Sequence, residues 1–466
     1  MSQAPSLPGK RPLRPRTPAP PRARRAVASG TFGSALEWFD FAVYGAMSAT
    51  IFPTLFFHSL DPAMGLLASF STFGVGFFAR PLGGIVFGHL GDRIGRRKVL
   101  LATFLAMGIS SLIIGLLPPY SAIGLAAPLL LVVMRFVQGF ALGGEATGAQ
   151  LMTMEHAPTD RRAFYGALMA MGSPISQVAA NAMLALLSAL LSEEAFLSWG
   201  WRIPFLFSIL LVAVGIYIRI KVEETPVFKE KTRELATQAT TPAAVLRGHG
   251  RTIARLILAF SPIVVTFYIV TVFGISYLTQ HGFSTTDTFT IIMISNILSV
   301  IAIWWGGRLA DVYGRRRILL IGSAGTLAAA VVFFPVVNTG SYPAALAMVA
   351  FALVAAQFGN AGQGALFAEA FPTHMRYTGS ALALTGANLI FAAPAPFLAS
   401  WLTGLTGGST VSITIFWVAV TTAAIINMLL MDDGKTLEGG RHTFGRYAPA
   451  PETAPAEVHP ESRSTA

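Results

Sequence analysis

The sequence predicts an all-α membrane protein in which twelve transmembrane helices form two parallel six-helix repeats. Only 12% of its 466 residues are charged, whereas a soluble chain carries roughly a quarter. The mean hydropathy is +0.61 and 53% of the residues are hydrophobic. Apolar stretches of about 20 residues recur, which is the length that a helix needs to cross a bilayer core of ~30 Å. Charged motifs from the first half of the chain return in the second half, which predicts the repeat.

Twelve apolar stretches follow one another along the chain, and a polar connection divides them six and six. The expected spans are residues 27–57, 65–89, 99–117, 124–152, 163–190, 202–221, 253–279, 288–309, 318–337, 342–369, 378–404 and 411–431. The longest connection, 222–252, is expected to be a cytoplasmic linker. It separates an N-terminal half, 27–221, from a C-terminal half, 253–431.

Both ends of the chain have the composition of disordered tails. Residues 1–26 contain seven Lys or Arg, no acidic residue and many prolines, so they cannot bury enough apolar surface to fold. Residues 432–466 are polar and rich in proline. The first span carries Glu37 and Asp40, and two carboxylates argue against a cleaved export signal.

The positive charges predict the orientation of the helices. Basic clusters fall on the same side as the N-terminal tail, at Arg93/Arg96/Arg97/Lys98, Arg161/Arg162, 222–252, Arg315/Arg316/Arg317 and Arg376. Among the connections of the opposite side only that around 188–202 carries a basic residue, Arg202. Since Lys and Arg stay in cytoplasmic loops, both termini are expected to be cytoplasmic, in a multi-pass protein of the inner membrane. The net charge of +11 then reflects topology, and no nucleic-acid partner is expected.

Two charged motifs occur twice. GHLGDRIGRRK at Gly88–Lys98 matches GRLADVYGRRR at Gly307–Arg317, and EHAPTDRR at Glu155–Arg162 matches EAFPTHMR at Glu369–Arg376. The offsets are 219 and 214 positions. Two matches at nearly equal offsets indicate parallel repeats related by an axis along the membrane normal.

The repeated G-x-L-A/G-D-x-x-G-R-R-x motif resembles the major facilitator superfamily. Further motifs are similar to its metabolite:proton symporter family, with shikimate-type carriers most similar: LEWFDF at 36–41, RPLGG at 80–84, RFVQGFALGGE at 135–145, GWRIPF at 200–205 and EETPVF at 223–228. The resemblance implies the major facilitator fold, with a central cavity between the first, fourth, seventh and tenth helices.

Five charged residues lie inside predicted spans: Glu37, Asp40, Arg80, Arg135 and Glu145. A charge at the bilayer centre costs at least ~2.5–3.5 kcal/mol on insertion scales, so such residues are paired or functional. Asp40 is the first candidate for a proton-coupling acid and Glu37 the second, with Arg135 as partner and anion clamp. The alternative is a permanent ion pair that only joins the first and fourth helices. Arg80 and Glu145 are candidates for buried charge pairing.

The second half offers neutral polar side chains where the first offers charges. The expected substrate-cavity residues are Arg135, Gln138, Gln177, Tyr268, Asn360 and Asn388. For the amides, hydrogen bonding between helices is the competing interpretation.

The repeated charged motifs are expected to act as gates, which in this superfamily latch the two halves together on the cytoplasmic side. The expected gating residues are Asp92, Arg93, Arg96, Arg97, Asp311, Arg315 and Arg316. The competing interpretation is a charge cluster that only orients the helices.

These observations favour a secondary active transporter that takes up a small organic acid together with protons by alternating access. Uptake of a zwitterionic osmolyte such as proline or betaine is the alternative, followed by an exporter or a non-transporting sensor. Gly434-Lys435-Thr436 is not a phosphate-binding loop, since Leu429 stands where its first glycine belongs. Without H-E-x-x-H or G-x-S-x-G the chain is not expected to be an enzyme or to need a cofactor or metal. It is expected to function as a monomer with protons, a small-molecule substrate and the lipid bilayer as partners.

Overall fold

The computed structural model describes residues 21–94, 96–143, 161–221, 241–372 and 375–431. For Glu37, Asp92, Arg93, Arg96 and Arg97 it describes the backbone and not the side chain. Glu145, the tail residues 1–20 and 432–466 and the linker residues 222–240 lie outside the described residues.

Every regular element within the described ranges is helical, which confirms the predicted all-α class. In the N-terminal half the elements are α1 (Pro21–Thr50), α2 (Phe52–Phe56), α3 (Pro62–Ile94), α4 (Arg96–Leu116), α5 (Tyr120–Ile123), α6 (Ala126–Leu142), α8 (Arg162–Ala170), α9 (Gly172–Leu190), α10 (Glu193–Ser198), η2 (Gly200–Arg202) and α11 (Ile203–Lys221). In the C-terminal half they are α13 (Pro242–Tyr268), η3 (Ile269–Phe273), α14 (Gly274–Gln280), α15 (Thr285–Tyr313), α16 (Arg315–Val337), α17 (Tyr342–Asn360), α18 (Gln363–Glu369), α19 (Arg376–Ala387), η4 (Asn388–Ala392), α20 (Ala395–Leu405) and α21 (Val411–Leu430).

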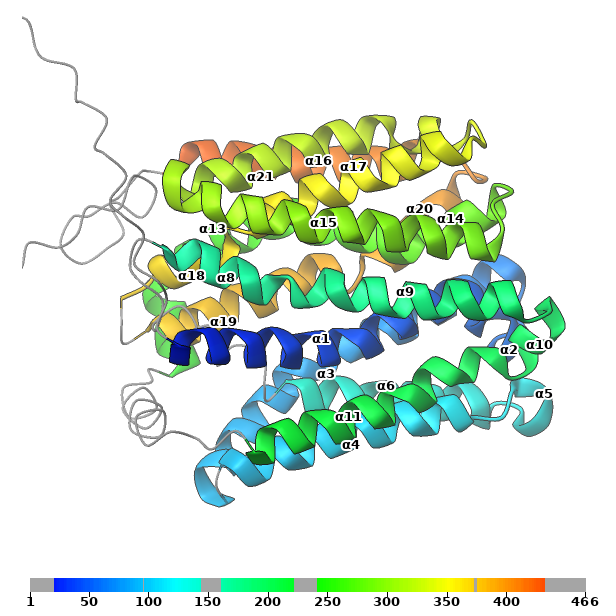
Figure 1. Cartoon of the computed structure of the whole chain (residues 1–466). Coiled ribbons are helices and arrows are strands. Elements are labelled where there is room, and N and C mark those ends of the chain that lie inside the picture. Colours follow the sequence, from blue (N-terminus) through cyan, green and yellow to red (C-terminus); the bar gives the residue numbers. More distant parts are fainter. Residues whose placement is uncertain (1–20, 95, 144–160, 222–240, 373–374, 432–466) are drawn as a thin grey trace, which may run out of the picture.

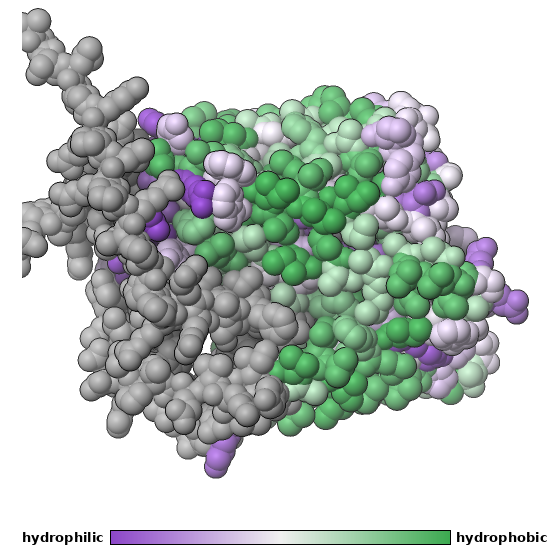
Figure 2. All heavy atoms as spheres, viewed as in Figure 1, coloured by the Kyte–Doolittle hydropathy of each residue, from purple (hydrophilic) through white to green (hydrophobic). Residues whose placement is uncertain are grey.

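Helices of the described chain correspond to the twelve predicted spans, and residues 144–152 of the fourth span lie outside the described residues. Eight helical stretches of the described chain are long and apolar enough to cross a membrane, three shorter apolar helices lie at 101–116, 126–142 and 200–215, and α1 supplies the first span. The helix axes run side by side, and the first and last described residues lie at the same end of the bundle (Figure 1). Figure 2 shows apolar residues over the middle of one face and hydrophilic residues toward its ends.

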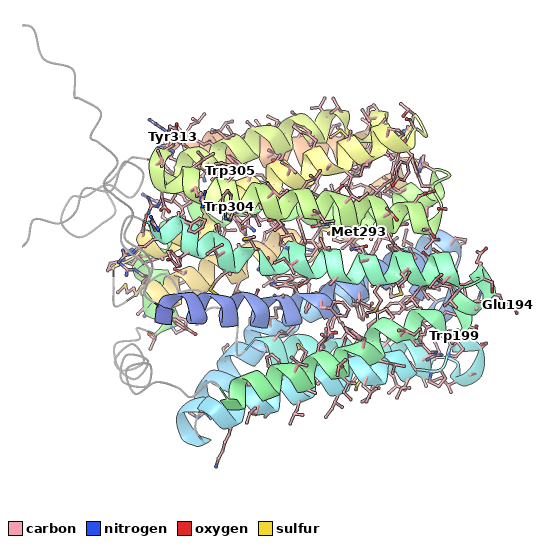
Figure 3. All side chains as sticks on the ribbon, in the orientation of Figure 1. Glu194, Trp199, Met293, Trp304, Trp305 and Tyr313 are labelled. Carbon is pink, nitrogen blue, oxygen red and sulfur yellow. The ribbon has the colours of Figure 1, made fainter. Side chains whose placement is uncertain are left out.

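Aromatic residues mark the two ends of this apolar belt. Trp304, Trp305 and Tyr313 lie toward one end of the bundle and Trp199 lies at the other (Figure 3). Trp and Tyr favour the two membrane–water interfaces because their rings are apolar with one polar edge. Their positions agree with a bundle that spans the bilayer along its long axis.

Two helices begin earlier than the sequence predicted. α1 begins at Pro21, within the expected tail 1–26, and α13 begins at Pro242, within the expected linker 222–252. Proline fits the first turn of a helix, where its missing N–H is not needed. The residues after Pro21 are Arg and Ala, which favour helix.

Glycines let α3 and α6 pack closely within the N-terminal half. A Cβ on Gly139 would lie 2.1 Å from the carbonyl oxygen of Gly76, and one on Gly143 would lie 2.0 Å from that of Arg80. No side chain fits at such distances. The backbones of α3 and α6 are therefore in direct contact, and this contact fixes Arg135 and Gln138 of α6 against α3.

The two halves meet along matched helices. α9 and α8 pack on α15, α8 also packs on α18, α3 packs on α20, and α1 packs on η3. Spans seven and eleven each contain a π-helical turn, η3 and η4. The interface between the halves therefore includes Tyr268 at the end of α13, which packs on Phe73 and Phe77 of α3.

Candidate functional site

Asp40 is the centre of a buried polar cluster contributed by three other helices. Its side chain is held on α1, and the residue is 1% exposed. Ser111 of α4 donates to Asp40 Oδ2 at 2.7 Å, and Ser208 of α11 donates to Oδ1. The carboxylate thus has one hydroxyl donor on each oxygen, and no lysine or arginine of the described chain touches it directly.

Arg135 is joined to Asp40 through two neutral side chains. Its Nη1 donates to Gln138 Oε1 at 2.7 Å, and Gln138 Nε2 donates to Ser111 Oγ at 2.8 Å. A direct ion pair between Asp40 and Arg135, which was the alternative interpretation, is absent among the described residues. Both side chains are buried, so this hydrogen-bonded chain is what connects the two charges across α1, α4 and α6.

The Arg135 guanidinium lies among aromatic rings. Its carbon is 3.9 Å from the ring centre of Phe41, 4.1 Å from that of Tyr44 and 5.3 Å from that of Phe73. Ring faces attract a cation when water is excluded. Nε and Nη2 of Arg135 have no hydrogen-bond acceptor among the described residues. Gly76 makes the arrangement possible, because a Cβ there would lie 2.7 Å from Arg135 Nε.

A second guanidinium and a tyrosine of the other half extend the cluster. Arg80 lies 4.2 Å from the ring centre of Phe41 and 5.0 Å from that of Phe77. Tyr268 packs on Phe73 and Phe77, with ring centres 5.8 and 5.4 Å apart. Tyr268 therefore brings the C-terminal half against the same rings that cover both arginines.

The remaining expected cavity residues do not join this cluster through hydrogen bonds. Gln177 accepts from Asn181 on α9, and Asn360 donates to Gln357 on α17. Asn388 begins the π-helical turn η4. Gln138, in contrast, belongs to the cluster, because it is bonded to both Arg135 and Ser111, and it is fully buried.

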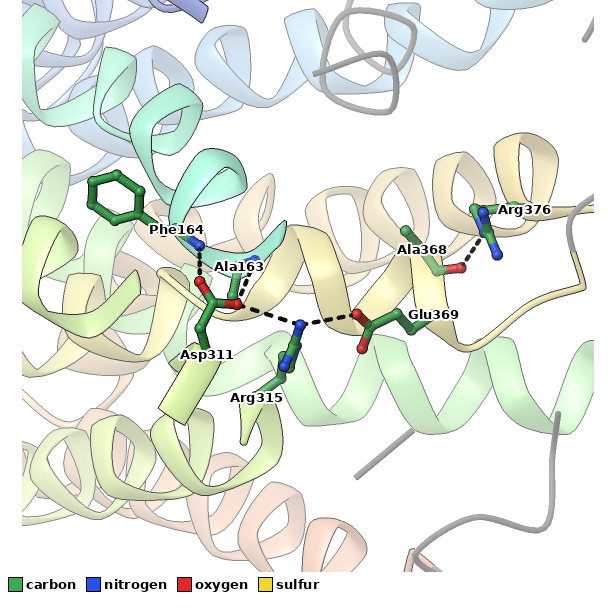
Figure 4. A network of polar contacts seen from close by, with 7 residues as sticks. All are labelled: Ala163, Phe164, Asp311, Arg315, Ala368, Glu369 and Arg376. Carbon is green, nitrogen blue, oxygen red and sulfur yellow. Dashed lines mark hydrogen bonds and ion pairs between the residues drawn. The ribbon is translucent and has the colours of Figure 1, made fainter. Parts of the chain in front are cut away.

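The gating motifs of the second half form a separate network (Figure 4). Asp311 accepts hydrogen bonds from the backbone N–H groups of Ala163 and Phe164, at 3.0 and 2.9 Å. These two N–H groups belong to the first turn of α8. A carboxylate is stabilised there by the free N–H groups and the positive end of the helix dipole. Asp311 thus joins the C-terminal half to the N-terminal half.

Arg315 connects the two repeated motifs. Its Nη2 lies 3.4 Å from Asp311 Oδ1 and 3.2 Å from Glu369 Oε1. Arg376 donates to the carbonyl of Ala368, which precedes Glu369. Arg316 instead donates to the carbonyl of Leu429 at the end of α21, within its own half. This bond lies within the C-terminal half, and the gating role of Arg316 stays a prediction.

The sequence did not reveal Ser111 and Ser208 as partners of Asp40. Serine is common in transmembrane helices, and nothing in its spacing distinguishes these two from Ser110, which bonds only to the carbonyl of Ala106 on its own helix. Their role depends on how α4 and α11 are rotated against α1.

Comparison with known proteins agrees with this architecture. The model of the Major Facilitator Superfamily matches residues 30–396. The chain belongs to the major facilitator superfamily. Members of this superfamily are membrane transporters, so the chain is a multi-pass membrane protein that transports small molecules and is not an enzyme.

Similar curated proteins cover most of the chain. It is 40% identical to the inner membrane metabolite transport protein YhjE of Escherichia coli, over 83% of this chain and 89% of that protein. It is 37% identical to the shikimate transporter of Escherichia coli, over 89% and 95%. It is 34% identical to the proline/betaine transporter of Salmonella typhimurium, over 82% and 78%.

Solved structures share the fold. A D-xylose-proton symporter superposes with a TM-score of 0.68 at 17% identity, covering 89% of this chain and 98% of that one. Both halves take part in that match, which confirms the twelve-helix major facilitator fold.

Proposed function

We propose that the chain takes up a small organic acid together with protons by alternating access. The observation that carries the proposal is the buried Asp40, hydrogen-bonded on both oxygens and connected to Arg135. A carboxylate shielded from water holds a proton more readily than one in water. When the site opens and water enters, the carboxylate therefore releases its proton more easily. Asp40 can therefore load a proton on one side of the membrane and release it on the other.

The spare donors of Arg135 support an acidic substrate. Nε and Nη2 form one edge of the planar guanidinium, and neither has an acceptor within the described part of the chain. A carboxylate has two oxygens that match such an edge. We infer that the substrate carboxylate binds there, beside the Phe41 and Phe73 rings, with Tyr268 closing the site from the other half.

The relatives support this class of substrate. The similarity to a shikimate transporter favours a hydroxylated carboxylic acid, and the similarity to an inner membrane metabolite transport protein favours the inner membrane as location. We further propose that both termini are cytoplasmic, that residues 27–221 and 253–431 rock as two halves about the central site, and that the monomer is the working unit.

Zwitterionic osmolytes are the second candidate, because the proline/betaine transporter is also similar to this chain. A zwitterion offers the same carboxylate to Arg135. The cationic group of a zwitterion would have to fit among rings that already contact Arg80 and Arg135. An acid without a cationic group avoids this repulsion and is therefore favoured.

Transport by purified protein in liposomes tests the proposal. The probes are shikimate, a dicarboxylate, a tricarboxylate, proline and glycine betaine, first in counterflow and then under an imposed pH gradient. We expect an organic acid to accumulate when the outside is acidic, without sodium, and a protonophore to abolish the accumulation. Sodium-driven uptake that ignores the protonophore would overturn proton coupling, and counterflow of the two zwitterions alone would overturn the acid.

A further inference from the structure

Gln138 touches both the Asp40 side and the Arg135 side of the buried cluster. Its Nε2 donates to Ser111 and its Oε1 accepts from Arg135. Sequence reasoning placed Gln138 in the substrate cavity, but both ends of its amide are occupied within the protein and none of its surface is exposed. Its contacts therefore indicate a connection between two charges.

The hydrogen bonds in this connection all run in one direction. Arg135 donates to Gln138, Gln138 donates to Ser111, and Ser111 donates to Asp40. With Asp40 ionised, its carboxylate can only accept, and every hydrogen of the connection then points toward it. Hydrogen bonds to a charged acceptor are roughly twice as strong as neutral ones. The negative charge of Asp40 thus holds Ser111, Gln138 and Arg135 in place.

Asp40 can hold a proton on Oδ1 without breaking the hydrogen bond that Ser111 donates to Oδ2. Ser208, the donor to Oδ1, also lies 3.1 Å from the carbonyl of Pro204. When Oδ1 takes up a proton, the Ser208 hydroxyl can turn its hydrogen to Pro204 and accept the new O–H of Asp40. One proton is gained, the carboxylate becomes neutral, and Oδ2 remains an acceptor for Ser111 but without its charge.

We propose that Gln138 is a positioning residue that makes the orientation of Arg135 depend on the charge of Asp40. With Asp40 ionised, Gln138 keeps Arg135 Nη1 occupied. With Asp40 protonated, the Ser111 contact weakens, Gln138 releases Nη1, and Arg135 turns its donors to the anionic substrate. This inference rests on the proposed proton symport and adds the route by which proton binding favours substrate binding.

Besides Glu37, which lies one turn earlier on α1 and whose side chain is outside the described part of the structure, arginine and tyrosine side chains lie around Asp40. Arg135 is the charged group connected to it, Arg80 shares the Phe41 ring with Arg135, and Tyr268 packs on Phe73 and Phe77. Tyr44, one turn along α1, donates to Thr72. α9 carries no titratable residue, and α4 and α11 contribute serines at this level.

Two neighbouring serines of α4 provide a matched test. Ser111→Ala removes the hydroxyl that links Gln138 to Asp40 Oδ2, whereas Ser110→Ala removes a buried hydroxyl that bonds only within α4. With radiolabelled shikimate in liposomes, we expect Ser111→Ala and Gln138→Met to exchange shikimate near the wild-type rate. Their pH-driven accumulation is expected to fall about tenfold, within the ~5–150-fold range of coupling between two sites. Ser110→Ala is expected to accumulate like wild type. Equal accumulation by Ser111→Ala and Ser110→Ala would overturn the proposal.

A measurement without substrate separates this inference from the proposed function. The side-chain Nε signal of Arg135, in protein labelled with nitrogen-15 arginine and assigned with Arg135→Lys, is followed by NMR at low and high pH. We expect it to move with pH in wild type and Ser110→Ala. In the variants Asp40→Asn, Ser111→Ala and Gln138→Met, the Arg135 Nε signal is expected to keep its low-pH chemical shift at high pH. A signal that follows pH normally in Ser111→Ala and Gln138→Met would refute the connection even if proton symport is found. If wild-type protein shows no proton symport but its Arg135 signal still moves with pH, only the proposed function is refuted.

Discussion

Asp40 is the residue on which proton coupling depends in this proposal. Asp40→Asn keeps the acceptor for Ser111 but can no longer gain or lose a proton. We therefore expect accumulation against a gradient to disappear while counterflow continues, because exchange needs no net proton movement. Paired counterflow and pH-driven uptake assays on the same liposomes measure both. Accumulation by Asp40→Asn at the wild-type level would exclude Asp40, and Glu37 would then be the next candidate on α1.

Arg135 is predicted to act through its shape as well as its charge. Arg135→Lys retains a positive charge but loses the planar edge formed by Nε and Nη2, and an ammonium cannot reproduce that geometry. We expect Arg135→Lys to bind substrate nearly as poorly as Arg135→Ala. Relative to wild type, the binding free energy is expected to weaken by about 1.5–3 kcal/mol, the value of a hydrogen bond to a charged group. Binding of the transported acid by calorimetry checks this. Near-normal affinity in Arg135→Lys would show that charge alone is sufficient.

At the scale of the elements, the contact between α3 and α6 depends on glycine. A Cβ at position 139 would meet the Gly76 carbonyl oxygen at 2.1 Å, so the helices must separate in Gly139→Ala. Overpacking of this kind costs ~1–3 kcal/mol. Gly404→Ala is the matched control, since nothing lies within 4 Å of a Cβ there. Thermal unfolding in detergent is expected to show a clear loss of stability for Gly139→Ala and none for Gly404→Ala. Equal melting curves would contradict the packing described here.

At the scale of the whole molecule, Asp311 holds the two halves together through the first turn of α8. Asp311→Asn removes the charge and leaves one acceptor oxygen for two N–H groups. We expect turnover to fall while substrate affinity is retained, because the contact lies apart from the Asp40 cluster. Asp287→Asn, on the same helix but paired locally with Ser284, is the control. Turnover in liposomes and binding in detergent separate the two effects. A lower affinity with normal turnover would place Asp311 in the substrate site. Asp92 is the counterpart of Asp311 in the first half, and it remains a predicted gate.

The fold was predictable because the bilayer leaves few alternatives. Apolar stretches of sufficient length must become helices there, since every backbone group has to be satisfied within its own segment. Composition and length therefore predicted the helices, and the repeated motifs predicted the two halves. The starts of α1 and α13 were missed, because at a helix end in water a proline is equally compatible with a tail and with a first helical turn.

The sequence by itself determined the class, the number of spans, the family and the rare charges inside the membrane, because each depends on composition or local spacing. Only the tertiary structure decided what those charges touch. The rotation of α4 and α11 brings Ser111 and Ser208 to Asp40, and Gly76 and Gly139 set the position of Arg135 beside Phe41 and Phe73. Asp311 reaches α8 across 147 residues of chain. Contacts between residues so far apart depend on how whole helices pack, and no local pattern of residues encodes that.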